Sequence, residues 1–222
     1  MEFDDFTLAA STADLGEEPA ARAHADCVEF RMDLADDPLD ALDAYSGELP
    51  ILATNRATWE GGEAPEEGRL ADLRTAAEHP SVEAIDIELA VVEEPKGRET
   101  VAHAHEHDAT VVVSVHDFEA TPDQEQLERL LARAAGAGDV GKLAVTAHDA
   151  DDTLALLAAT RALTREGARV ATMAMGDAGS HTRAVAPVYG SKIGYAPVDP
   201  ANATAPGQYD LETLRGLVEA LR

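Results

Sequence analysis

The chain has 222 residues, of which 45% are hydrophobic, so it is long enough and apolar enough to bury the core of one domain. Its single cysteine, Cys27, excludes a disulfide scaffold, and its longest apolar runs, such as Thr110 to Val115, are too short to cross a membrane. A formal net charge of -26 argues against nucleic acid as a partner, because the chain would repel phosphate groups.

Short β-rich segments alternate with segments rich in alanine, leucine and glutamate along the whole chain. The pattern predicts strands at Phe6–Ser11, Cys27–Asp33, Pro50–Asn55, Ala84–Leu89, Thr110–Val115, Lys142–Ala147, Arg169–Met175 and Ser191–Ala196. It predicts helices at Glu18–His24, Pro38–Ser46, Glu66–Glu78, Lys96–His107, Pro122–Ala135, Asp151–Glu166, Ser180–Tyr189 and Asp210–Leu221. The sixth helix is the clearest, because its acidic start, Asp151-Asp152, suits a helix N-terminus.

Eight strands, each followed by a helix, predict an α/β fold of the closed parallel kind, the (β/α)8 or TIM barrel. No linker, tandem repeat or low-complexity segment divides the chain, so we expect one catalytic domain over residues 1–222. A doubly wound open sheet is the alternative, and it would be expected to carry a glycine-rich turn after the first strand. The residues there, Ala9-Ala10-Ser11-Thr12-Ala13, form no such turn.

Polar residues occupy strand positions where the interior of a barrel would be apolar. In a barrel, alternate strand residues point inward, and sites form at the carboxyl ends of the strands. The polar residues are Glu29, Arg31 and Asp33 in the second strand, Thr54-Asn55-Arg56 and then Glu60 after the third, Ser114 and His116 in or after the fifth, and Lys142 at the start of the sixth. Buried charges are costly unless paired, so their convergence predicts a functional site.

Lys142 opens a segment, Lys142–Thr146, that is typical of a buried strand. Burial would remove water from its ammonium group and lower its pKa, which makes a neutral amine nucleophile more available. The chain has only three lysines against fourteen arginines, and arginine could not form an imine. The alternative is a structural lysine that reaches the bottom rim of the barrel. The sequence pattern alone leaves both interpretations open.

His116 is the natural acid–base partner for Lys142, because imidazole titrates near neutral pH without a large perturbation. The fifth predicted strand, which it follows, precedes the Lys142 strand directly in the chain. A structural role for a lone histidine at the end of a strand is the alternative.

Six motifs together resemble the type I 3-dehydroquinate dehydratase family, whose members are barrels like the class I aldolases. They match in order and spacing from the first strand to the last helix. They are Glu29-Phe30-Arg31-Met32-Asp33, Arg56 with Glu60-Gly61-Gly62-Glu63, Ser114-Val115-His116-Asp117-Phe118, Lys142, Met173-Ala174-Met175 and Ala205-Pro206-Gly207-Gln208.

This resemblance implies a hydro-lyase that uses a Schiff base. Lys142 would attack the C3 ketone of 3-dehydroquinate and form a protonated imine, which stabilises the carbanion left when a C2 proton departs. His116 would assist imine formation, remove that proton and then protonate the departing C1 hydroxyl, a syn elimination that gives 3-dehydroshikimate. Glu60 would orient His116 and raise its basicity. The covalent imine makes a metal or diffusible cofactor unnecessary.

The resemblance also implies the residues that bind the substrate. Arg183 would hold the ring carboxylate with its guanidinium fork. The ring hydroxyls and the carboxylate would be bonded by Glu29, Arg31, Arg56, Thr204 and Gln208. The loop Thr204–Gln208 would close over the substrate, because a charged intermediate is best kept from bulk water. Many family members are homodimers, and we expect the same here.

The 43 acidic residues are scattered over the whole chain and outnumber the 17 basic ones. This pattern resembles proteins of salt-accumulating cytoplasms, where concentrated counterions screen the repulsion between acidic groups; an acidic protein from a low-salt organism is the alternative. The first residues, Met1 to Asp5, have neither the basic start nor the apolar stretch of a signal peptide. We therefore expect a cytoplasmic protein.

Three further features suggest sites but favour simpler interpretations. His103, His105 and His107 are spaced like metal ligands, but helix positions two apart point roughly 200° from each other, so at most His103 and His107 share a face and an exposed helix end is predicted. Lys192 could form an imine on chemical grounds, but the family motifs have no lysine there. Gly176–Ser180 could form a phosphate cup, but Asp177 opposes an anion.

Two other functions remain open at this point. Another Schiff-base barrel, such as a class I aldolase acting on a phosphosugar, would require phosphate for turnover. A barrel that binds a metabolite without catalysis would have no need of an amine nucleophile.

Overall fold

Eight parallel strands form a nearly closed barrel in the computed structural model, which describes residues 1–199 and 207–222. The strands are β1 (Thr7–Thr12), β2 (Cys27–Arg31), β3 (Ile51–Thr54), β4 (Val82–Glu88), β5 (Thr110–Asp117), β6 (Val140–Thr146), β7 (Val170–Met175) and β8 (Ile193–Pro197). Each strand from β1 to β6 pairs with the next, and β8 pairs with β1. A parallel bridge between Val170 and Ser191 joins β7 to the residues before β8. The predicted (β/α)8 barrel is thus confirmed.

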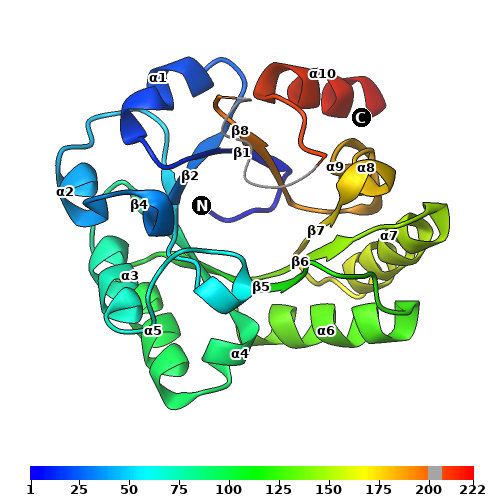
Figure 1. Cartoon of the computed structure of the whole chain (residues 1–222), viewed down its shortest axis with the longest axis horizontal. Coiled ribbons are helices and arrows are strands. Elements are labelled where there is room, and N and C mark those ends of the chain that lie inside the picture. The colour runs from blue at the N-terminus through cyan, green and yellow to red at the C-terminus, as the bar shows by residue number, and fades with distance from the viewer. Residues whose placement is uncertain (200–206) are drawn as a thin grey trace.

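Helices surround the ring of strands, as Figure 1 shows. They are α1 (Glu18–Ala21), α2 (Pro38–Asp43), α3 (Arg69–Ala77), α4 (Leu89–Val92), α5 (Pro95–Glu106), α6 (Gln124–Ala137), α7 (Ala150–Arg165), α8 (Gly176–Gly179), α9 (Thr182–Val185) and α10 (Leu211–Leu221). Short 3-10 helices lie at Leu15–Glu17 (η1), Met32–Leu34 (η2), Thr58–Glu60 (η3) and Ala186–Tyr189 (η4). Over the described part of the chain, no helix is both long and apolar enough to cross a membrane.

In β3, β5 and β6 the inward side chains change from apolar to polar along the strand. Leu52, Val112 and Val140 belong to the apolar cluster inside the lower barrel. Two residues further along the same strands come Thr54, Ser114 and Lys142, all buried. Because two residues restore the same face of a strand, these polar groups point into the barrel above the apolar layer. The fold therefore places the polar groups at the carboxyl ends of the strands.

The bounds of all eight strands differ by one or two residues from the predicted ones, and three of the differences concern predicted site residues or their neighbours. β6 begins at Val140, so Lys142 is its third residue and not its first. β5 runs on to Asp117 and includes His116. β2 stops at Arg31, and Asp33 lies in η2.

The predicted helix Ser180–Tyr189 is wrong as one element. The chain there forms α9 and then η4, with Pro187 in η4, and α8 lies just before the predicted start. α4 was not predicted, because its four residues are too few for a helical period to show. The first helix ends at Ala21 and not at His24.

Gly141 lies inside β6, just before the predicted start of the sixth strand at Lys142, and it allows close packing. A Cβ atom at Gly141 would lie 2.6 Å from the backbone nitrogen of Ala135 in α6. The absence of a side chain therefore lets α6 lie directly on the strand that carries Lys142.

We expect Gly141→Ala to lower the free energy of unfolding by about 1–3 kcal/mol, because the added methyl group forces α6 away from β6. Gly136→Ala is the matched control, since a Cβ at Gly136 meets nothing within 4 Å and alanine favours the helix. Denaturant unfolding in multimolar salt measures both. Equal stability of the two variants would contradict the close packing.

Candidate active site

A cavity opens at the carboxyl ends of the strands. It brings together residues from six strands and the loops that follow them. They are Glu29, Arg31, Thr54, Arg56, Glu60, Gly61, His116, Phe118, Lys142, Ala144, Met173, Met175, Arg183, Tyr195 and Gln208. Eight of the nine residues predicted for the site thus line one cavity. The ninth, Thr204, lies outside the described residues.

Lys142 lies within the barrel and not at its bottom rim. Its side chain is 5% exposed, and its Nζ donates a hydrogen bond to Asp86 Oδ2 at 2.9 Å. Glu29 Oε1 lies 3.7 Å from the same nitrogen, and Nζ stands 4.2 Å from the centre of the Tyr195 ring. The interpretation as a rim lysine is therefore wrong. The amine is held between two carboxylates and an aromatic face.

Asp86 joins Lys142 to Arg56. Its Oδ1 accepts hydrogen bonds from Arg56 Nη2 and from Ser114 Oγ, both at 2.7 Å. Burial alone would raise the pKa of Asp86, but the positive charges of Arg56 and Lys142 outweigh it and hold the pKa well below its usual range. Asp86 is therefore ionised, and it fixes two cations of the site at once.

Glu88 supports the end of β3 from below the cavity. It accepts hydrogen bonds from Arg69 Nη1 at 2.9 Å and from the backbone nitrogen of Ala57 at 3.0 Å, and lies 3.3 Å from Arg56 Nη1. Asp86 and Glu88 are both buried, yet neither lines the cavity. The sequence showed two acidic residues on the inward parity of the fourth strand, but not that they hold Arg56.

His116 and Glu60 form the second pair of the site. Nδ1 of His116 lies 2.8 Å from Glu60 Oε2, so Nε2 is the ring nitrogen left for a ligand. Burial lowers the pKa of His116 well below its usual value, and the nearby charges of Arg56 and Lys142 act in the same direction. Burial also raises the pKa of Glu60 to about 8. We had expected Glu60 to raise the basicity of His116; the surroundings have the opposite net effect and keep the imidazole neutral.

The turn that carries Glu60 depends on Gly61. Gly61 ends η3 in the left-handed region, with a φ of 78°, which favours glycine. The Phe118 ring packs so close that a Cβ at Gly61 would lie 2.3 Å from it. The same ring stacks on His116 with centroids 5.8 Å apart. Phe118 therefore ties the turn to the end of β5 and holds Glu60 beside His116.

Two of the predicted substrate-binding residues, Glu29 and Arg31, lie on β2 and have fixed hydrogen-bond partners. Glu29 Oε2 accepts a hydrogen bond of 2.5 Å from Ser11, and its Oε1 accepts one of 3.3 Å from Thr54. Arg31 makes a bidentate contact with Asp33, at 2.8 and 2.6 Å. These partners set the orientation of both side chains before a ligand arrives.

Arg183 reaches the cavity from α9, the short helix after β7. The side chain is buried, and burial lowers its pKa to about 10, which leaves it charged at neutral pH. Gln208, half-buried, follows the segment that contains Thr204.

Tyr195 is a site residue that sequence analysis missed. It lies on the inward parity of β8, is 4% exposed and faces Lys142. Burial raises the pKa of its hydroxyl well above the usual value, so the ring stays neutral. The only signal in the sequence was one aromatic residue among small ones in the last strand.

The fold and the site define a (β/α)8-barrel protein with a buried lysine and a histidine–carboxylate pair at the carboxyl ends of its strands. The sequence model of the type I 3-dehydroquinase family matches residues 7–222. The chain belongs to this family and, as a member of it, is a hydro-lyase.

Similar proteins agree with this assignment. The chain is 62% identical to 3-dehydroquinate dehydratase of Haloarcula marismortui, over all of this chain and 99% of that protein. It is 53% identical to the enzyme of that name from Halobacterium salinarum, over the full length of both. The crystal structure of 3-dehydroquinate dehydratase from Geobacillus kaustophilus superposes with a TM-score of 0.86 at 27% identity, covering 98% of this chain and 91% of that one. The halophilic character predicted from the acidic composition fits the two haloarchaeal relatives.

We expect Asp86→Asn to lower the free energy of unfolding by about 3–5 kcal/mol near neutral pH, because it leaves two buried cations without their shared carboxylate. The pKa of Asp86 is lowered by folding, so its contribution is present above the usual carboxyl range and is lost as the pH falls below it. The difference between the two proteins should therefore shrink in acid.

Glu125→Gln is the control for this experiment. It removes an exposed carboxylate that pairs with Arg129, and it should change the free energy by no more than about 0.5 kcal/mol. Denaturant unfolding at several pH values measures all three proteins. An Asp86→Asn variant as stable as Glu125→Gln would show that the shared carboxylate stabilises nothing.

Proposed function

We propose that this chain dehydrates 3-dehydroquinate to 3-dehydroshikimate through an imine on Lys142, by syn elimination. The observation that carries the proposal is the buried Lys142 amine in one cavity with His116, which comes from the adjacent strand. Family membership supplies the reaction class, and the geometry supports the roles of the residues.

Lys142 is the nucleophile in this proposal. Its amine gives up a proton, attacks the C3 ketone and expels the carbonyl oxygen as water, which leaves a protonated imine. The carboxylates of Asp86 and Glu29 stand 2.9 and 3.7 Å from Nζ and stabilise the positive charge that reappears on the nitrogen. The Tyr195 ring face favours the same cation.

His116 is the proton carrier. Its lowered pKa keeps the imidazole neutral, so Nε2 is able to accept the C2 proton. The electrons of the C2–H bond move into the imine, and the C1 hydroxyl then leaves with the proton that His116 carries. Hydrolysis of the imine releases the product and restores the amine. Glu60 holds the ring by Nδ1 throughout, at 2.8 Å.

The remaining residues of the cavity position the substrate. Arg183 and Arg56 provide charges for the ring carboxylate, while Glu29, Arg31 and Gln208 offer partners for the hydroxyls. In the proposal, Thr204 also binds the substrate. The reaction needs no metal or diffusible cofactor, because the imine supplies the electron sink.

We further propose one catalytic domain over residues 1–222, a cytoplasmic location and a homodimer. The match of the family over residues 7–222 supports the first. The acidic composition supports the second, since it suits a salt-rich cytoplasm. The homodimer is proposed because many members of the family are homodimers. Nothing in this proposal involves nucleic acid or a membrane.

Two other functions are weaker. An aldolase acting on a phosphosugar would need a phosphate cup at Gly176–Ser180, but Gly176–Gly179 forms the short helix α8 with Asp177 in its first turn. A barrel that only binds a metabolite does not need the lysine, histidine and carboxylate set. Turnover of 3-dehydroquinate by the isolated chain, with phosphate absent, separates all three.

Borohydride added with 3-dehydroquinate in multimolar salt should reduce the imine and attach the ligand mass to Lys142, because this amine is the one that lines the cavity. Peptide mass mapping locates the adduct. Lys142→Met is the control and should show none. Lys192 is the competing amine, outside the cavity with its Nζ near the Asp4 carbonyl, and labelling there would overturn the assignment.

His116→Ala should still form an imine, slowly, while the elimination rate falls by several powers of ten, roughly 4 kcal/mol or more of barrier. Absorbance of the unsaturated product measures elimination, and borohydride trapping measures imine formation. His105→Ala is the matched control, an exposed histidine of α5 that pairs with Asp139. Near-normal turnover by His116→Ala would remove His116 from the mechanism.

A further inference from the structure

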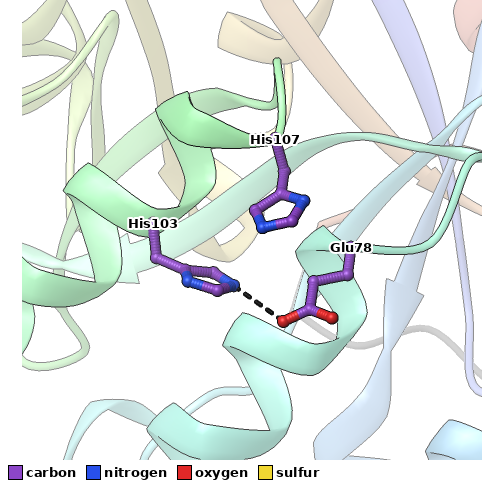
Figure 2. A group of neighbouring side chains, drawn as sticks. All are labelled: Glu78, His103 and His107. Atoms are coloured by element: carbon purple, nitrogen blue, oxygen red, sulfur yellow. Dashed lines mark hydrogen bonds and ion pairs between the residues drawn. The ribbon is translucent and has the colours of Figure 1, made fainter.

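Glu78, His103 and His107 form a cluster on the outer surface of the barrel, remote from the lining of the catalytic cavity. Each offers one ligand atom, and the three atoms lie within 4.8 Å of one another. Figure 2 shows the two rings and the carboxylate turned toward the same space between α5 and α3. The three histidines of α5 are the only ligand candidates that the sequence pattern indicates here, because nothing in the sequence shows that Glu78 lies opposite them.

The histidines are presented by helix geometry. His103 and His107 are four residues apart at the end of α5, one turn of helix, so they share a face. Their ring centroids are 4.6 Å apart. Glu78 comes from α3, and its Oε1 lies 3.0 Å from His103 Nε2. His105 lies between the two histidines in the sequence but turns away and contacts Asp139 at 2.9 Å.

Both helices end at the cluster. Glu78 is the C-terminal cap residue of α3, and His107 is that of α5. The last carbonyl groups of a helix carry partial negative charge, so two helix C-termini side by side favour a cation. The net charge of -26 adds to that preference.

We propose that Glu78, His103 and His107 bind a divalent transition-metal ion of the zinc type. Two imidazole nitrogens and one carboxylate suit Zn²⁺, Co²⁺, Ni²⁺ and Cu²⁺, whereas Mg²⁺ and Ca²⁺ prefer oxygen ligands alone. A tetrahedral Zn²⁺ with bonds of about 2.0–2.2 Å holds its ligand atoms about 3.4 Å apart. The three atoms reach that spacing by moving roughly 1 Å, which rotation of partly exposed side chains provides.

The ion would connect the C-terminal ends of α3 and α5, with a fourth position left for water. Because the folded chain presents the ligands together and the unfolded chain does not, binding stabilises the fold. The site is part of the outer helical layer, so we expect the ion to change stability and to leave turnover unchanged. This inference is independent of the proposed function.

The test is titration of the full chain with Zn²⁺ in multimolar potassium chloride, with excess Mg²⁺ to occupy the scattered carboxylates. We expect one ion per chain, and at a concentration about 100 times Kd a rise in Tm of about 5–10 °C. His103→Ala, His107→Ala and Glu78→Gln should each weaken binding at least about 10-fold. His105→Ala is the matched control on the same helix and should bind as the parent does.

Co²⁺ adds a spectroscopic readout, because its visible absorption band changes when a nitrogen ligand is lost. The Tm of each variant without metal shows that it folds. Three results would overturn the proposal: displacement of Zn²⁺ by Mg²⁺, equal loss of affinity in His105→Ala and His103→Ala, or one ion shared by two chains. Loss of binding in His116→Ala together with inhibition of turnover by Zn²⁺ would place the ion in the catalytic cavity and overturn it as well.

Discussion

The carboxylate of Asp86 is the interaction on which the site depends. It lies 2.9 Å from the Lys142 amine and 2.7 Å from Arg56, so one buried anion holds two cations that would otherwise repel each other. A buried ion pair stabilises a fold only when its remaining lone pairs are used, and Ser114 takes up another of them here. The connected network of ion pairs and hydrogen bonds thus offsets the desolvation cost of burying these charges. The same network fixes the position of the Lys142 amine.

The surroundings shift the pKa values of His116 and Glu60 in opposite directions. Burial and neighbouring cations lower the pKa of His116, while burial raises that of Glu60 to about 8. The imidazole is therefore neutral near neutral pH, with its Nδ1 beside Glu60. Arg56, which Asp86 holds from the next strand, lowers the pKa of His116 and opposes the rise in the pKa of Glu60.

The sequence was sufficient for the barrel and for the inward residues, because strand periodicity and the order of the elements are local properties. It was not sufficient for the partners of those residues. Lys142 was predicted as buried, but not as the neighbour of Asp86 and Tyr195, which come from strands far away in the chain. The start of β6 was missed for a similar reason. A glycine such as Gly141 weakens the prediction of a strand, and the packing of α6 on that glycine is not visible in the sequence. Contacts across the barrel are set by register and shear, which single-strand patterns do not contain.

The acidic surface repels an anionic ligand, whereas the cationic side chains of the cavity attract it. A chain of net charge -26 repels an anionic ligand at long range, yet the cavity collects Arg31, Arg56, Lys142 and Arg183. In about 1 M salt the Debye length is about 3 Å, so the repulsion from the surface is screened before a ligand reaches the barrel. Contacts within the cavity join adjacent buried groups that are shielded from solvent and salt, so they keep their strength. Concentrated salt therefore weakens the repulsion that hinders an anionic substrate and preserves the attraction that binds it.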